Sequence, residues 1–125
     1  MKALFSIKPE YVNKILSGEK KYEFRRKIFK RQDIDTIVIY STLPQGAVVA
    51  EASIARVLEA DPDELWEQTH EYGGISKSDF MHYFEGSTCA YAIKLGRINR
   101  FSTPVQLSDY SSKIHHPPQS FAYID

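Results

Sequence analysis

Short segments rich in β-branched and aromatic residues recur along the chain between turn residues, and this pattern predicts a fold built mainly of strands. Residues 36–40 read Thr-Ile-Val-Ile-Tyr, which is typical of a strand buried on both faces. In the second half of the chain strand follows strand, without the regular alternation with helices that a parallel sheet requires. The pattern favours a small mixed or antiparallel barrel. The other expected strands are residues 3–7, 21–26, 47–59, 89–101, 104–107 and 120–124.

Three short helices are expected to decorate this barrel, which makes the fold class α+β. Pro9 suits the first turn of a helix, because a proline there gives up no helical hydrogen bond, and Gly18 is a typical residue just after a helix end. Asp61 and Ser76 are suitable N-caps for two further helices. The expected helices span Pro9–Ser17, 62–71 and 77–84.

The chain has 125 residues, the usual size of one domain, so we expect a single domain over residues 1–125 that acts as a monomer. Its single cysteine, Cys89, excludes an internal disulfide and is expected to be a small buried strand residue. No metal or cofactor is predicted, and His115 and His116 are expected in an exposed turn. No apolar run approaches the roughly 20 residues that span a bilayer, and Lys8 interrupts the first strand too early for a signal peptide. The expected location is therefore the cytoplasm.

The formal net charge is zero, but the charges are unevenly distributed along the chain. Residues 1–31 carry ten Lys or Arg against three Asp or Glu, whereas residues 51–85 carry two against nine. If these two segments occupy different faces, the protein is a dipole whose positive side attracts phosphate. A simpler interpretation of the acidic segment is the solvated face of a helix.

The densest basic cluster falls between positions 20 and 31, which hold seven of the sixteen basic residues. In the strand expected there, the two aromatic residues point to one side and Lys21, Glu23 and Arg25 to the other. Basic residues interleaved with aromatic ones suit phosphate contacts together with base stacking, although charged strand faces are also common without a ligand. A carboxylate does not help to bind phosphate alone. Glu23 is therefore interpreted as orienting a guanidinium or as accepting a hydrogen bond from a ligand amine. We therefore predict a basic cleft that holds RNA or a nucleotide-like ligand.

Neighbouring residues complete the predicted cleft. The end of a strand before a helix often faces a ligand, which places Ser6 and Lys8 on the cleft wall. The segment Tyr72-Gly73-Gly74 is either a lip over the cleft or a helix terminator. Trp66, on the apolar side of a short helix, is expected in the core rather than as a stacking platform. The predicted ligand-binding residues are Ser6, Lys8, Lys20, Glu23, Arg25 and Arg26.

Four motifs together match the pattern of one known family. They are Ser6-Ile7-Lys8-Pro9-Glu10, Gly18-x-Lys20-x-x-Glu23-x-Arg25, the segment 66–76 and the strand Ala90-Tyr91-Ala92-Ile93. With these motifs the chain, from Leu4 to about Phe101, resembles the ASCH domain, named for activating signal cointegrator homology. The resemblance implies a small stand-alone member with a PUA-like mixed β-barrel of about five or six strands, three short helices and a cleft beside the first helix. For this family RNA binding has been proposed, and a few members are enzymes.

One branch of the family consists of small amidohydrolases that deacetylate acetylcytidine with a lysine, a threonine and a glutamate. Lys20 matches the lysine, but Glu23 stands where the threonine nucleophile would be. The glutamate position falls near Gly73, with Glu71 as the nearest acidic residue. Because a carboxylate is a poor substitute for a hydroxyl nucleophile, we expect no such activity or only a trace.

Lys20 and Glu23 are the candidate catalytic residues if the cleft carries out chemistry. Lys20 acts as a base only if burial, or Lys21 and Arg25, lowers its pKa far enough, whereas Glu23 would raise that pKa. We expect instead a structural ion pair between Lys20 and Glu23 that binds a polar base edge, so binding of RNA or a modified nucleoside ranks above turnover. The alternatives are a hydrolase of acylated nucleosides, a single-stranded RNA nuclease, or a protein-interaction module of transcription or translation that uses the acidic residues 59–71.

Overall fold

All the strands belong to one mixed sheet in the computed structural model, which describes residues 1–124. Their order across the sheet is β2-β5-β4-β3-β1-β6, so β2 and β6 are its edges. β1 and β3 pair in parallel, and the other neighbours pair in antiparallel fashion. The strands are β1 (Lys2–Ile7), β2 (Tyr22–Arg25), β3 (Thr36–Ser41), β4 (Ala47–Ala60), β5 (Ala90–Val105) and β6 (Phe121–Ile124).

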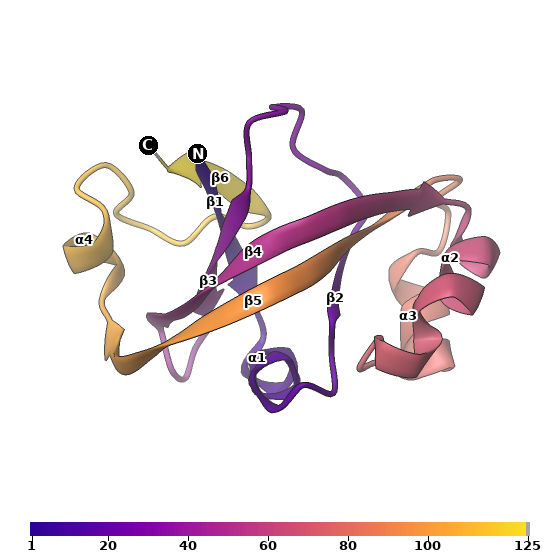
Figure 1. The fold of residues 1–125 in the computed structure, drawn as a ribbon, viewed down its shortest axis with the longest axis horizontal. Helices are drawn as coiled ribbons and strands as arrows, with labels where there is room; N and C mark the ends of the chain where they lie inside the picture. Colours follow the sequence, from indigo (N-terminus) through magenta and orange to yellow (C-terminus); the bar gives the residue numbers. More distant parts are fainter. Residues whose placement is uncertain (125) are drawn as a thin grey trace.

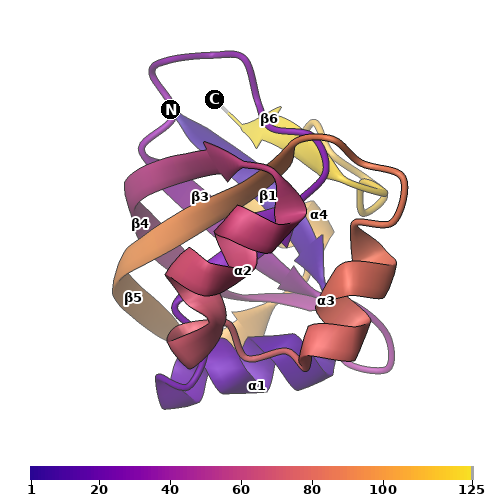
Figure 2. The same cartoon turned by 90° about the vertical axis from the view of Figure 1, so that its right-hand side faces the viewer.

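The sheet is curled into a half-barrel around its longest strands, β4 and β5 (Figures 1 and 2). Register shifts near Ile54 let these two strands bend together, because an extra residue in one strand kinks the ladder. The predicted strand-rich α+β class is confirmed, and the six strands within residues 1–124 agree with the five or six that the family resemblance implies. Because the edge strands β2 and β6 are not neighbours in the sheet, the barrel is open on one side.

Within residues 1–124 four α-helices surround the half-barrel, one more than predicted. Figure 1 shows α2 and α3 together at one end of the β4–β5 ribbon and α4 at the opposite end, with α1 against the sheet between them. The fourth helix corrects the expectation that residues 104–107 form a strand of their own. β5 runs on to Val105, and Leu107 begins a one-turn helix because its side chain is buried under the sheet. The helices are α1 (Pro9–Ser17), α2 (Pro62–Thr69), α3 (Lys77–Tyr83) and α4 (Leu107–Tyr110), with a short 3-10 helix η1 (His70–Tyr72) after α2.

Both faces of the central strands are buried, as the run at residues 36–40 predicted. On one face, Phe5 and Ile39 pack with Ile15 of α1. On the other, Leu4 and Val38 pack with Leu107 of α4. Side chains alternate along a strand, so one strand supplies both layers.

A third apolar cluster attaches α2 and α3 to the β2 edge of the sheet. Phe24, Leu65 and Phe80 form its centre, and the Phe24 and Phe80 rings meet edge to face with their centroids 5.0 Å apart. Trp66 packs against this cluster, as expected from its place on α2. The cluster therefore decides where α3 stands relative to the predicted cleft.

Cys89 is not the buried strand residue that was predicted. It precedes β5 and is partly exposed, and its thiol donates to the Glu59 carboxylate at 3.3 Å. The strand begins only at Ala90, the first residue of this stretch whose side chain is enclosed. His115 and His116 are exposed in an irregular segment, as expected.

The carboxylate of Glu51 joins β1, β4 and α4 at a partly buried position. Lys2 Nζ lies 3.0 Å from each of its oxygens, and the Tyr110 hydroxyl donates to Oε2 at 2.6 Å. Burial and this hydrogen bond raise the pKa of Tyr110, so the phenol remains a donor throughout the ordinary pH range.

Replacing Tyr110 by phenylalanine removes this donor and keeps the ring. Tyr110→Phe is expected to lower the free energy of unfolding by about 1 kcal/mol, because a hydrogen bond to a partly buried charge is lost. Urea unfolding measures the change, and Tyr72→Phe, which alters a half-exposed phenol, is the matched control with an expected change below about 0.5 kcal/mol. Equal stability of Tyr110→Phe and the wild type would contradict the role of the contact.

Candidate functional site

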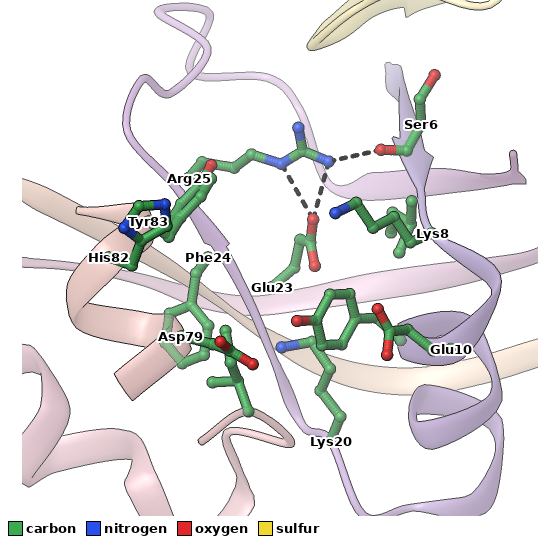
Figure 3. Close-up of a pocket in the computed structure, with 13 residues that line it drawn as sticks. Ser6, Lys8, Glu10, Lys20, Glu23, Phe24, Arg25, Asp79, His82 and Tyr83 are labelled. Carbon is green, nitrogen blue, oxygen red and sulfur yellow. Dashed lines mark hydrogen bonds and ion pairs between the residues drawn. The ribbon is translucent and has the colours of Figure 1, made fainter. Parts of the chain in front are cut away.

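A cavity of about 430 Å³ opens between the end of β1, the helix α1, the strand β2 and the helix α3 (Figure 3). Five of the six predicted ligand-binding residues line it, and Arg26 does not. The lining residues are Ser6, Ile7, Lys8, Glu10, Tyr11, Lys20, Glu23, Phe24, Arg25, Ile75, Asp79, His82 and Tyr83.

The junction between α1 and β2 turns the side chain of Lys20 inward. Gly18 ends α1 at a φ of 89°, in the left-handed region that glycine adopts without steric cost. The backbone N–H of Lys20 then donates to the Lys14 carbonyl at 3.0 Å, and that of Lys21 donates to the Tyr72 carbonyl at 2.8 Å. As a result Lys20 is only 3% exposed.

The ammonium of Lys20 has one hydrogen-bond acceptor and two aromatic rings around it. Nζ donates to the Gly73 carbonyl at 2.7 Å. It lies 4.6 Å from the ring centre of Phe24 and 5.2 Å from that of Tyr11. Burial lowers the pKa of Lys20 to about 8, although the nearby Glu23 carboxylate acts in the opposite direction. At pH 8 about half of the Lys20 side chains are therefore neutral amines.

The predicted ion pair between Lys20 and Glu23 does not form. Within residues 1–124 no carboxylate oxygen lies within 4.0 Å of the Lys20 ammonium. Glu23 pairs with Arg25, whose Nη2 lies 2.8 Å from Oε2 and whose Nε donates to the same oxygen at 3.0 Å. The reason is geometric: residues two apart on a strand share a face, whereas Lys20 precedes the strand and reaches the cavity from the junction.

The pair of Glu23 and Arg25 is fixed inside the half-barrel. Arg25 Nη2 also donates to the Ser6 carbonyl at 3.0 Å, and its guanidinium carbon lies 4.7 Å from the ring centre of Phe5. Glu23 and Arg25 are 7% and 9% exposed. Within residues 1–124 Oε1 of Glu23 accepts no hydrogen bond, so it remains available to a ligand in the cavity (Figure 3). Lys21, expected on this face, precedes β2 and lines a separate groove together with Tyr22.

The other predicted residues contribute in different ways. The Ser6 hydroxyl donates to the Pro118 carbonyl at 2.6 Å and so holds the C-terminal segment beside the cavity. Lys8 is exposed at the mouth, one residue before α1. Arg26 is exposed with its guanidinium carbon 5.1 Å from the ring centre of Tyr83, which makes it a residue of the rim.

Sequence reasoning missed Tyr11 and the cavity residues of α3. Asp79 and His82 are three residues apart on one helix, so they share a face, and that spacing was a usable signal. Nothing in the spacing says that this face meets β2, because the contact depends on the cluster around Phe80. Burial, with the nearby carboxylates of Glu10 and Asp79, raises the pKa of Tyr11, so its phenol stays protonated.

The segment of residues 72–74 packs directly against Lys20. The Gly74 carbonyl accepts a hydrogen bond from Lys14 Nζ at 3.2 Å. Gly74 has a φ of 65°, and a Cβ at this position would lie 2.6 Å from Cβ of Lys20, so no other residue fits without a shift. The segment ends the helical stretch of α2 and η1 and at the same time covers Lys20.

The ASCH domain model matches residues 5–102, a range that begins within β1, includes the α1–β2 junction and ends within β5. The chain belongs to the ASCH domain family, as its motifs predicted. The ASCH domain-containing ribonuclease of Zymomonas mobilis subsp. mobilis is 32% identical over 125 residues, which is 98% of this chain and 83% of that protein. Large ribosomal subunit protein uL22 of Ureaplasma parvum is 26% identical over 88 residues, which is 70% of this chain but only 28% of that protein.

Solved structures agree with this assignment. The crystal structure of the ASCH protein from Zymomonas mobilis has a TM-score of 0.89 and 29% sequence identity, and the match covers 99% of this chain and 87% of that one. A variant of the same protein matches with a TM-score of 0.89, 28% identity and coverage of 99% and 90%. These matches confirm the predicted PUA-like fold.

No helix within residues 1–124 is long and apolar enough to cross a membrane. The same residues contain no group of three or more His, Cys, Asp or Glu arranged to hold a metal ion.

The lowered pKa of Lys20 has a measurable effect on stability. Since the pKa in the folded protein lies near 8 and the usual value is 10.5, the unfolded chain binds more protons between these pH values. The free energy of unfolding of the wild type should therefore rise with pH across this window, relative to that of Lys20→Met, by about 1–3 kcal/mol. Urea unfolding of both proteins at a series of pH values measures the difference. A difference that does not change with pH would show that the amine is not desolvated.

Proposed function

We propose that this protein binds single-stranded RNA and holds one nucleotide, ordinary or modified, in the cavity beside Lys20. The observation that carries the proposal is the burial of three charged side chains, Lys20, Glu23 and Arg25, around a cavity of about 430 Å³. Burying charge costs free energy, so a cavity that keeps these groups is better explained by a polar, charged ligand than by stability. The relative named as a ribonuclease supports RNA as that ligand.

Each group has a defined part in the proposed complex. Lys8 at the mouth and the protonated form of Lys20 attract phosphate. Oε1 of Glu23 accepts a hydrogen bond from an amine on the base edge, while Arg25 holds the carboxylate in place. Arg26 and Tyr83 form a flat rim on which a neighbouring base stacks. Ser6 acts through its carbonyl, which fixes Arg25.

The binding proposal is tested with variants that remove one positive charge each. Lys8→Ala and Lys20→Met are each expected to weaken binding of a short single-stranded RNA about three- to tenfold, and to reduce the salt dependence by about one counterion, because one phosphate contact is lost. Fluorescence anisotropy at low and high salt measures both quantities.

Arg100→Ala is the matched control for the loss of charge. Arg100 of β5 is exposed and pairs with Ala50 of β4. It lies about 20 Å along β5 from Lys94, the nearest β5 residue that pairs with β2. The affinity of Arg100→Ala for the same RNA should stay close to that of the wild type. Failure of the wild type to bind RNA at low salt, or wild-type affinity in both test variants, would refute the proposal.

RNA cleavage is a second candidate function, and the pKa of Lys20 near 8 favours it. A group that transfers protons works best when its pKa lies near the operating pH. In the reaction the 2′ oxygen bonds to phosphorus and the bond to the 5′ oxygen breaks, while one proton leaves the 2′-hydroxyl and another reaches the 5′ oxygen. Neutral Lys20 can accept the first proton, or its ammonium can supply the second. Lys8 and Arg25 face the charge of the phosphate.

Cleavage would depend on Lys20 far more strongly than binding does. Lys20→Met and Lys20→Arg are both expected to reduce the cleavage rate at least about a hundredfold, because neither side chain exchanges a proton near pH 8. If Lys20 is the base, the wild-type rate rises up to about pH 8, and if it is the acid, the rate falls above that pH. Gel analysis of end-labelled RNA measures the rate.

Two substrates serve as controls for this reaction. DNA of the same sequence, which has no 2′-hydroxyl, should remain intact. Acetylcytidine should also remain intact, because Glu23 offers a carboxylate where acyl transfer needs a hydroxyl nucleophile. Cleavage that survives in Lys20→Met would exclude this role for Lys20, and deacetylation that disappears in Glu23→Gln would overturn the interpretation of Glu23.

A further inference from the structure

A second hollow, of about 450 Å³, lies beside the start of β2 and is lined by none of the cavity residues. We call it the outer groove. Lys20 and Phe24 line the cavity, whereas Lys21 and Tyr22 line the outer groove, so the α1–β2 junction contributes consecutive residues to two neighbouring hollows. The groove is bounded by Lys21, Tyr22, Glu67, Gln68, Thr69, His70, Glu71, Tyr72 and Lys94.

Two cations on the outer side have no carboxylate partner. Lys94 of β5 lies directly opposite Arg56 of β4 in the ladder, and neither takes part in an ion pair within residues 1–124. Like charges at directly opposed positions of a sheet repel each other and lower its stability. A bound anion would relieve this repulsion, so the pair is suited to a phosphate group.

An aromatic ring stands exposed at the same groove. Tyr72 is 46% exposed, and Nζ of Lys21 lies 4.2 Å from its ring centre. The hydrogen bond from the Lys21 N–H to the Tyr72 carbonyl fixes the backbone of both residues. An exposed aromatic ring beside a cation is the arrangement on which bases of single-stranded nucleic acids stack.

The acidic residues of the groove limit what it can bind. Glu67 and Glu71 are exposed on its α2 and η1 side and oppose the charge of Lys21 and Lys94. A groove of balanced charge is a poor site for free phosphate. It suits a nucleotide, whose phosphate meets Lys94 and Arg56 while the amine groups of its base donate to a carboxylate.

We propose that the outer groove binds further nucleotides of the same RNA strand whose neighbouring nucleotide occupies the cavity. The inference rests on the proposed function and adds the route that the RNA follows beyond the cavity. Lys20 lines the cavity and the next residue, Lys21, lines the outer groove, so one strand of RNA can reach both hollows from the α1–β2 junction. Tyr72 is the stacking residue of this path, and Lys94 with Arg56 binds its phosphate.

The path predicts that the substitutions act only on longer RNA. For an RNA of about eight nucleotides, Tyr72→Ala and Lys94→Glu should each lower the affinity about tenfold, since one stacked base or one phosphate contact is lost. For a nucleoside monophosphate, which occupies the cavity alone, both variants should bind like the wild type. Tyr72→Phe keeps the ring and Lys94→Arg keeps the charge, so these two should retain the affinity for both lengths. Fluorescence anisotropy measures all the affinities.

The outcomes separate this inference from the proposed function. If Tyr72→Ala and Lys94→Glu bind the longer RNA as well as the wild type does, the outer groove is not on the path, although the cavity can still bind RNA. If both variants lose affinity for the nucleoside monophosphate to the same degree, the effect is on the cavity and the inference is wrong. If the wild type binds neither the RNA nor the nucleoside monophosphate, the proposed function fails and the path with it.

Discussion

Two hydrogen bonds connect the α1–β2 junction to the last residue of η1 and the turn that follows it, and the geometry of the site depends on them. The Lys21 N–H donates to the Tyr72 carbonyl, and the Lys20 ammonium donates to the carbonyl of Gly73. They bring segments some fifty residues apart in the sequence into contact. Gly74 permits the approach, because any side chain there would meet Lys20. Through the same turn, α3 is directed to the far wall of the cavity.

This contact also sets the electrostatics of the cavity. Lys20 meets a neutral carbonyl and two aromatic rings rather than a carboxylate, so its charged form is stabilised less than in an ion pair. Glu23 in turn is neutralised by Arg25. The result is a titratable amine next to a fixed ion pair. A cavity of this kind is suited both to binding a charged ligand and to exchanging a proton with it.

Much of the fold could be predicted from the sequence, because hydrophobic periodicity and capping residues are local signals. The β-branched run at residues 36–40, the proline at the start of α1 and the caps of α2 and α3 each correspond to an observed element. The fourth helix was missed because Leu107 looks the same at the end of a strand as in a single buried turn. Cys89 was misplaced for a similar reason, since the start of β5 depends on its pairing with β4.

The sequence by itself determined which residues could form the site: the Gly18-x-Lys20-x-x-Glu23-x-Arg25 motif and Ser6 and Lys8 lie on short local elements whose direction follows from their own pattern. Only the tertiary structure decided how these groups pair and which other residues join them. Local periodicity places Glu23 and Arg25 on one face, but it contains no information on the burial of Lys20 or on the approach of Gly73 and of α3. Burial and long-range contacts arise only when the helices pack on the folded sheet. The pKa of a buried amine depends on both.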